Sequence, residues 1–367
     1  MGREGGPKNR HNPEGKAPLR ALSRGMRSVR QNNELMSQTG TRRLRVFAVV
    51  PCLHPFVRKD LELLRKNFEV RVGYYRGPWS IPSILLGTLW ADITFSRFAD
   101  IHAFPAVLFS RIFGKKSIVV VGGYEVAKIP EIRYGLALSP VKSHILRYVL
   151  KRADRVLTVD ESLKSDAIRN VGVEGENITT VPNGFDSEKF SFKGEKENMV
   201  LTAYLCSTWQ RVRLKGLDTF VRTAEHLPHL QFVTVGVHGP VLKDLRRISP
   251  SNVTFIPPVE ENDLIPYYQR AKVYCQLSMR EGLPNALCEA MLCECVPVGT
   301  DVQGIRTAMG DAGFYVSYGD PLAVKEAIEK ALAMGSGKLA RERIRRLFPL
   351  EQREKRFAEI IEGLTHE

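Results

Sequence analysis

The stretch KVYCQLSMREGLPNALCEAM, residues 272–291, contains an apolar strand, a turn and the start of a helix in immediate succession. Glu281 leaves the carboxyl end of the strand, and Gly282 allows a ligand to approach the backbone closely. Pro284 suits the first position of a helix, whose free amide groups favour a phosphate. Glu289 follows about a turn and a half inside that helix, so both glutamates can reach one ligand. A ligand-binding turn between a strand and a helix is typical of a parallel α/β sheet.

Strands alternate with helices on both sides of this stretch, which predicts parallel sheets covered on both faces. The expected strands are residues 44–52, 68–75, 91–98, 116–124, 153–162, 198–207, 230–237, 253–259, 272–279 and 296–301. The expected helices are residues 54–68, 77–91, 101–114, 139–153, 162–173, 214–227, 261–271, 284–294, 321–335 and 350–364. In such sheets, ligands bind outside the carboxyl ends of the strands.

A hinge is expected within TTVPNGFDSEKF, residues 179–190, because Pro182, Asn183 and Gly184 are turn formers. The predicted fold is therefore α/β, with two Rossmann-like domains that face a cleft. The predicted boundaries are a tail at 1–41, a first domain at 42–183, a second domain at 184–345, and a closing helix at 346–367 that packs back toward the first domain.

Composition and charge restrict the classes of partner. Hydrophobic residues make up 43% of the 367 residues, and the net charge is +14, which favours anionic partners such as nucleotides, phosphates, acidic lipids or nucleic acid. No DNA- or RNA-binding motif supports a nucleic acid. The six cysteines read better as buried free thiols than as a metal site and suggest a reducing cytoplasm. They are Cys52, Cys206, Cys275, Cys288, Cys293 and Cys295.

Two segments bear on membranes. No apolar run reaches about 18 residues, so no transmembrane helix is expected. The uncharged segment GPWSIPSILLGTLWA, residues 77–91, is predicted to be a core-facing helix, and a membrane-touching surface is the alternative. Residues 1–41 lack the apolar core of a secretory signal and are predicted to be a disordered basic tail. That tail is either simply solvated or a tether to anionic lipid on the inner face of a membrane.

A second candidate element is CSTWQRVRLKGLD, residues 206–218, between the first strand of the second half and a helix. Arg211, Arg213 and Lys215 place three cations at this junction. Such cations neutralise a diphosphate leaving group, and arginine binds it bidentately. A solvated basic loop is the alternative, which the nearby glutamate motif disfavours.

Several motifs resemble the retaining GT-B glycosyltransferases of family 4, the glycogen-synthase-like group. EGLPNALCEAM resembles their Glu-x7-Glu motif, VPNGFD their interdomain turn, and LKGLDTFVRTAEHL their KG-[LV]-D helix start. Residues 263–291 follow the family pattern, and DVQGIRTAM resembles the next loop. The resemblance covers most of residues 180–320 and implies two Rossmann-like domains, the first for the acceptor and the second for a nucleotide-diphosphate sugar.

The family's residue roles follow motif by motif. The first glutamate, matched by Glu281, contacts the donor sugar, and the second, matched by Glu289, holds the ribose. Lys215 matches the lysine that binds the diphosphate, and an arginine just before it is matched by Arg211 or, with less typical spacing, by Arg213. The turn that approaches the sugar and phosphate is matched by Gly282, Leu283, Pro284 and Asn285, although Pro284 has no N–H. Fixed cations and amides stabilise the leaving group, so no metal or other cofactor is expected.

The first half departs from the family. PCLHPFVRKDLELL replaces a Gly-Gly loop, and VGGYEV replaces a histidine-bearing H-G-x-D segment. His102, Gly123 and Glu125 are the weak acceptor-side candidates. The leading hypothesis is sugar transfer to a glycan, a glycolipid or another cell-surface acceptor by a peripheral cytoplasmic enzyme. The alternatives are a GT-B enzyme that phosphorolyses or epimerises sugars, and a catalytically silent module that binds a nucleotide sugar or acts as a scaffold.

Overall fold

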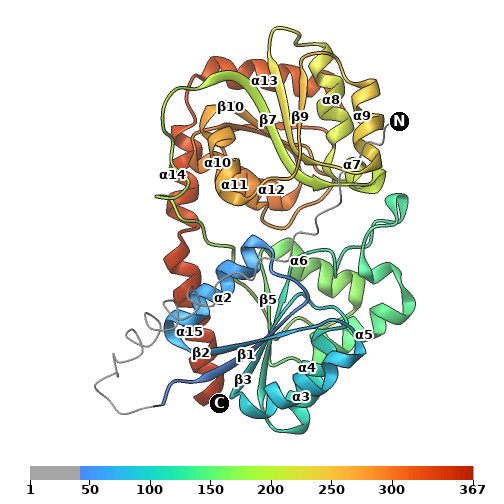
Figure 1. The fold of residues 1–367 in the computed structure, drawn as a ribbon, viewed down its shortest axis with the longest axis vertical. Coiled ribbons are helices and arrows are strands. Elements are labelled where there is room, and N and C mark those ends of the chain that lie inside the picture. Colours follow the sequence, from blue (N-terminus) through green and yellow to red (C-terminus); the bar gives the residue numbers. More distant parts are fainter. Residues whose placement is uncertain (1–41, 367) are drawn as a thin grey trace, which may run out of the picture. The chain divides into compact units, whose positions relative to one another are not determined.

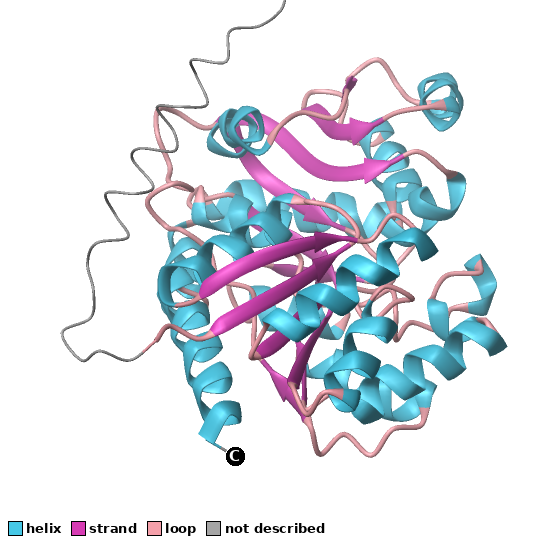
Figure 2. Ribbon diagram, turned by 60° about the horizontal axis from the view of Figure 1, so that its bottom comes forward, coloured by secondary structure: helices cyan, strands magenta, loops and turns pink. Residues whose placement is uncertain are grey.

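The computed structural model describes residues 42–366. Leu44–Glu367 forms one compact unit, which contains two six-stranded sheets. The two Rossmann-like sheets were predicted, and helices cover both faces of each (Figures 1 and 2). The predicted tail at residues 1–41 and its role as a tether lie outside the described residues.

The first sheet has the strand order β2-β1-β3-β4-β5-β6, and every neighbouring pair is parallel. Its strands are β1 (Arg45–Val50), β2 (Glu69–Tyr74), β3 (Ile93–Arg97), β4 (Lys116–Val121), β5 (Arg155–Thr158) and β6 (Ile178–Thr180). The helices between them are α2 (Pro55–Asn67), α3 (Ile81–Trp90), α4 (Ala103–Ile112), α5 (Pro140–Arg152) and α6 (Glu161–Asp166). Short 3-10 turns cover Pro78–Ser80, Pro130–Ile132 and Leu136–Leu138, and a π-helical turn covers Ala167–Val171.

The second sheet has the order β12-β11-β10-β7-β8-β9, again with parallel neighbours. Its strands are β7 (Glu197–Cys206), β8 (Gln231–Val237), β9 (Val253–Ile256), β10 (Ala271–Gln276), β11 (Val296–Thr300) and β12 (Phe314–Val316). The helices are α7 (Trp209–Lys215), α8 (Leu217–Glu225), α9 (Pro240–Ile248), α10 (Glu261–Arg270), α11 (Asn285–Leu292), α12 (Gln303–Met309), α13 (Pro321–Met334), α14 (Lys338–Leu347) and α15 (Leu350–His366).

Both sheets change direction at their first strand. β1 lies between β2 and β3, and β7 lies between β8 and β10. In open parallel sheets, ligands bind beyond the carboxyl ends of the strands at such a switch point. The segments that follow β7 and β10 therefore meet where the second sheet is open to a ligand.

The last described helix, α15, returns to the first sheet and packs against α2 (Figure 1). Phe357, Ile361 and Leu364 belong to the same apolar core as the strands of that sheet. Arg353 is 3% exposed and donates to Asp60 on α2, at 2.7 and 2.9 Å, and to the carbonyl oxygens of Val181 and Pro182 at the hinge. The helix thus joins α2, the hinge and the first core.

Residues 81–90 form the predicted helix, α3, which faces the core along one strip and leaves its outer face exposed. On α3 only Ile84 and Thr88 are buried, whereas Leu86 is 66% exposed. A Cβ on Gly87 would lie 2.2 Å from the ring of Phe47, so the helix contacts the sheet through a narrow strip. A short helix that is apolar all round leaves its other faces uncovered when only one strip meets the sheet.

Other differences are local. The helix predicted at 162–173 ends as α6, after which the π-helical turn runs to Gly172, which has a left-handed conformation (φ 73°). Asp160 caps α6, since its side chain accepts from the N–H of Ser162 at 2.9 Å. The sequence did not predict β6, α7, α9, α12, β12 or α14 as separate elements. Glu294, which follows α11, has a left-handed conformation with a φ of 62°, a conformation that favours glycine.

All six cysteines are free thiols, as predicted, and all but Cys52 are buried. Within residues 42–366, no group of three or more His, Cys, Asp or Glu side chains is arranged to hold a metal ion. None of the helices in that range is long and apolar enough to cross a bilayer.

Candidate active site

Glu281 lies just beyond the carboxyl end of β10, at the switch point of the second sheet. One of its carboxylate oxygens, Oε1, accepts hydrogen bonds from Lys215 at 2.5 Å, from Gln276 at 2.8 Å and from Ser278 at 2.6 Å. Its other oxygen, Oε2, has no hydrogen bond from any residue in 42–366. The carboxylate is therefore held in one orientation and keeps one oxygen open to a ligand.

Lys215 reaches Glu281 because α7 ends there. Gly216 turns the chain with a φ of 63°, and a Cβ at this position would lie 2.1 Å from the carbonyl oxygen of Leu277. Only glycine permits both the left-handed turn and the close approach. The ammonium group of Lys215 also lies 5.4 Å from the centre of the Tyr204 ring.

The basic segment is a short helix, α7, rather than a loop, with Thr208 as its cap. Residues four apart share a face of a helix, so Arg211 lies on the same side as Lys215 and Arg213 on another. Arg211 lines the cavity that contains Lys215 and Glu281. Arg213 does not line that cavity, and its carbonyl oxygen accepts from the hydroxyl of Tyr318 at 2.6 Å.

This cavity has a volume of about 320 Å³. Gly282, Leu283, Pro284 and Asn285 form its wall on the side of α11, whose first helical residue is Asn285 and whose cap position is Pro284. The predicted position of Pro284 is therefore off by one residue. No side chain caps α11, so its first amide groups remain available to an anion. Asn285 Oδ1 accepts from Asn183 of the hinge turn at 2.8 Å.

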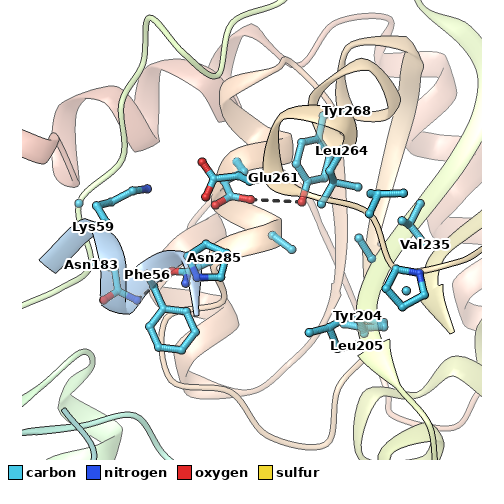
Figure 3. Close-up of a pocket in the computed structure, with 18 of the residues that line it drawn as sticks. Phe56, Lys59, Asn183, Tyr204, Leu205, Val235, Glu261, Leu264, Tyr268 and Asn285 are labelled. Atoms are coloured by element: carbon cyan, nitrogen blue, oxygen red, sulfur yellow. Dashed lines mark hydrogen bonds between the residues drawn. The ribbon is translucent and has the colours of Figure 1, made fainter. Parts of the chain in front are cut away.

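A neighbouring cavity of about 290 Å³ contains Glu289 (Figure 3). The two cavities share Phe56, Asn183, Tyr204, Leu205 and Asn285 among their lining residues, so they adjoin. Apolar side chains, including Val235, Val259 and Leu264, line the far part of this second space. Together the two cavities offer a charged end and an apolar end to one elongated ligand.

Glu289 is 9% exposed and lies in different surroundings from Glu281. Its Oε2 accepts a hydrogen bond of 3.3 Å from the hydroxyl of Tyr268, a fully buried side chain of α10 (dashed line in Figure 3). Burial raises the pKa of Glu289 to about 7, and the positive charge of Lys59 partly opposes that rise. Polar ligand groups in this cavity therefore meet a carboxyl group that titrates near neutral pH.

Comparison with known families agrees with this geometry. The sequence profile described as "Glycosyl transferases group 1" matches residues 202–334, which hold Lys215, Glu281 and Glu289. The profile described as "Glycosyltransferase Family 4" matches residues 60–189. The chain belongs to the group 1 glycosyltransferases.

Individual relatives of this group 1 chain are distant. D-inositol 3-phosphate glycosyltransferase of Xylanimonas cellulosilytica is 28% identical over 208 residues, which cover 50% of this chain and 50% of that protein. O-antigen chain mannosyltransferase RfbU of Salmonella typhimurium is 24% identical over 201 residues, which cover 50% of this chain and 53% of that protein. The chain thus spans about half the length of the curated relatives it matches.

Solved structures share the fold over nearly the whole chain. HepE of Anabaena, in complex with UDP and glucose, aligns with a TM-score of 0.72 at 13% identity and covers 88% of this chain and 100% of that one. Sucrose-phosphate synthase of Thermosynechococcus elongatus aligns with a TM-score of 0.72 at 15% identity, over 87% of this chain and 99% of that one. The fold is therefore the GT-B fold of these glycosyltransferases.

In this group 1 chain the predicted acceptor-side residues have structural contacts and line neither cavity. His102 is 3% exposed, its Nε2 lies 2.7 Å from the carbonyl oxygen of Arg97, and burial lowers its pKa. The carboxylate of Glu125 accepts from the backbone N–H groups of Ala99, Gly122 and Gly123 and so fixes the loop that replaces the family's histidine segment. Gly122, not Gly123, reaches the cavity wall.

Several residues near the site were missed by the sequence reasoning. Arg280 donates to Asp166 on α6 at 3.0 Å and to the carbonyl oxygen of Gly123 at 3.0 Å, which ties the Glu281 turn to the first sheet's loops. Arg97, at the carboxyl end of β3, is 2% exposed and lines the Glu281 cavity. The strand-end rule points to Arg97, whereas no local pattern marks Tyr268 or Asp166.

Proposed function

We propose that this protein is a retaining hexosyltransferase that moves a sugar from a nucleotide-diphosphate sugar to a hydroxyl group of a glycan or lipid-linked acceptor. The observation that carries the proposal is the Lys215–Glu281 pair, 2.5 Å apart in a cavity that also receives the uncapped start of α11. A cation, a carboxylate and free amides in one space suit a sugar bound to a diphosphate.

The donor fits the two adjoining cavities from end to end. The diphosphate lies between Lys215, Arg211 and the first amides of α11, and the sugar lies against the open oxygen of Glu281. The ribose hydroxyls donate to the carboxylate of Glu289, and the base occupies the apolar end beside Val235 and Leu264. The structure of HepE with UDP and glucose supports a donor of this class.

The reaction needs leaving-group stabilisation more than a nucleophile on the protein. The bond between the anomeric carbon and the diphosphate oxygen breaks, and the acceptor oxygen attacks that carbon from the same face. The acceptor proton passes to the departing phosphate oxygen, so charge and protons balance without an enzyme base. Lys215, Arg211 and the α11 amides stabilise the negative charge, and Glu281 stabilises the positive charge on the sugar. No metal ion takes part in this scheme.

The acceptor enters from the side of the first sheet. A polar cavity of about 500 Å³ reaches Glu281 and is lined by Lys128, Ser162, Asn170 and Gln303 among others. A hydroxyl-rich substrate can form hydrogen bonds with the polar side chains that line this cavity. The relationship to an O-antigen chain mannosyltransferase supports a glycan of this kind. Buried free thiols suit a reducing cytoplasm, and we place the enzyme there, at the inner face of a membrane.

The decisive test is a thermal-shift panel of UDP, GDP, ADP and their sugars, repeated in EDTA. At about 100 times its dissociation constant, the correct nucleotide adds roughly 2.7 kcal/mol of stability. We expect the shift to survive EDTA and to be lost in Lys215→Met, with Lys325→Met on α13 as the matched control. An absence of any shift contradicts the proposed donor. With the responding donor, NMR of the anomeric centre in the product is expected to show retention.

A further inference from the structure

Exposed apolar side chains are concentrated on one part of the first domain. Trp79 is 93% exposed, Leu86 66% and Ile112 62%. The remaining members of this set are Tyr74, Ile81, Leu89, Ile101 and Phe113, each more than a third exposed. All eight come from residues 74–113. Monomeric proteins rarely expose this much apolar surface in one region unless something covers it.

These side chains lie on neighbouring elements. α3 and α4 pack side by side, one before and one after β3 (Figure 1). Leu86 and Leu89 are three residues apart and therefore share a face of α3. Ile112 and Phe113 stand at the end of α4, and Trp79 lies on the turn before α3. We name these residues, with Ile81, the α3–α4 face.

The segments that form the α3–α4 face carry basic residues and no acidic ones. Residues 70–91 and 103–116 contain no aspartate or glutamate. The same two segments contain the basic residues Arg71, Arg76, Arg111, Lys115 and Lys116. Arg71 stacks over the ring of Trp90 at 4.0 Å, and Arg76 and Arg111 are exposed. Glu69 and Asp92 border these segments, but the segments themselves contribute five basic residues and no acidic one. An apolar surface with mainly basic residues beside it complements a layer that is apolar inside and anionic at its surface.

We propose that the α3–α4 face docks the protein on an anionic lipid membrane, with Trp79 and the leucines of α3 inserted at the headgroup level. Tryptophan suits this depth because its ring is apolar and its N–H is polar. A second copy of the chain fits the face poorly, since a two-fold contact would oppose basic residues to basic residues. An anionic membrane complements both the apolar side chains of the face and the basic side chains beside them.

The docked orientation serves acceptor delivery. The turn that carries Trp79 follows the carboxyl end of β2, and Arg97 of the Glu281 cavity ends β3 at the same edge of the sheet. An acceptor anchored in lipid therefore needs to rise only along this edge to reach the site. This delivery step rests on the proposed function, whereas the docking itself does not.

Vesicle flotation of the full chain tests the docking. Vesicles contain phosphatidylcholine alone or mixed with phosphatidylglycerol. We expect binding to the mixed vesicles only, and a loss of roughly tenfold or more in partitioning for Trp79→Ala/Leu86→Ser/Leu89→Ser and for Arg76→Gln/Arg111→Gln. The matched control is Leu322→Ser/Leu339→Ser, which removes leucines of 57% and 63% exposure from α13 and α14 and should bind like the unmodified chain.

Three results would overturn the proposal. The unmodified chain fails to float with anionic vesicles, the triple variant floats as well as the control, or binding depends on residues 1–41 and not on the face. A concentration-dependent dimer in light scattering that the triple variant abolishes assigns the face to a second copy instead. Nucleotide thermal shifts on the same samples separate the two ideas, because a lost shift with intact flotation contradicts only the proposed function.

Discussion

At the scale of single residues, the two glutamates of one motif have opposite environments. Glu281 is paired with a lysine and receives three hydrogen bonds at one oxygen. Glu289 is buried beside a tyrosine hydroxyl, and burial raises its pKa to about 7. Glu289 therefore changes charge in the physiological range.

Glu289→Gln should alter stability in a pH-dependent way. Because the folded pKa of about 7 lies above the ordinary 4.5, the stability linked to this group is present below about pH 4.5 and is lost as the pH rises through 7. Glutamine avoids the buried charge, so the variant should be more stable than the unmodified protein at about pH 8, by at most about 3 kcal/mol, and nearly equal at about pH 5. Urea unfolding at both pH values measures this. An equal difference in stability between the variant and the unmodified protein at both pH values would contradict the titration of Glu289.

Arg211 and Arg213 form a matched pair for the diphosphate assignment. Arg211 lines the Glu281 cavity and Arg213 does not, although both are exposed arginines of one helix. Arg211→Met should weaken the binding of the nucleoside diphosphate by roughly tenfold to a hundredfold, because a hydrogen bond to a charged group contributes about 1.5–3 kcal/mol. Arg213→Met should leave it nearly unchanged. Titration calorimetry compares them, and equal losses would assign the effect to net charge.

At the scale of elements, the turn between α7 and α8 orients the side chain of Lys215 toward Glu281. Gly216 combines a φ of 63° with close contact to the backbone of Leu277 on the neighbouring loop. The turn therefore couples the end of one helix to the segment that carries Glu281. Lys215 and Glu281 therefore cannot be displaced independently of each other.

Gly216→Ala should lower the free energy of unfolding by more than a left-handed alanine alone would. A left-handed alanine costs about 1–2 kcal/mol, and here its Cβ would also lie 2.1 Å from the carbonyl oxygen of Leu277. Gly335→Ala is the control, since its φ is 74° and nothing lies within 4 Å of the added Cβ. We expect the first variant to unfold more easily and to lose most of its turnover, and the second to lose stability only. Similar losses of stability and turnover in both variants would show that the contact with Leu277 has no special role.

Local patterns predicted the strand before Glu281 and the strand-to-helix junction that contains Lys215, because the carboxyl-end rule and a glycine turn act over a few residues. They did not predict the helix α7. The placement of Arg280 and Tyr268 depends on partners far along the chain, Asp166 and Glu289, and no period in the sequence records such pairs. The exposed side of α3 was not predicted for the same reason, since its apolar composition does not tell which face the sheet covers.

At the scale of the whole described chain, Arg353 holds the last helix, α15, against the first domain. It joins Asp60 to the hinge carbonyls from a buried position on α15. Asp60 also pairs with the buried Arg97 at 3.3 Å, so the loss of Arg353 removes one of two cationic partners of Asp60 and the donor of the hinge carbonyls.

Arg353→Met should therefore destabilise the protein by about 1.5–3 kcal/mol, the usual loss for hydrogen bonds to a charged group. Lys355→Met on the same helix is the control, because the Lys355 side chain is 78% exposed and lies 4.0 Å from Glu359. Its effect should stay within about 0.5 kcal/mol. Denaturant unfolding at neutral pH measures both. If the two variants lose similar stability, the buried pair is not what holds α15 in place.

The return of α15 also sets an order of events during synthesis. The strands of the first sheet leave the ribosome long before residues 350–366 exist, yet Phe357, Ile361 and Leu364 are part of their core. A nascent chain must therefore carry an unfinished first domain, with apolar surface uncovered, while the second domain is translated. Chaperones that bind such surfaces would be needed at that stage, and a premature stop codon just before α15 would be as harmful to the first domain as to the second.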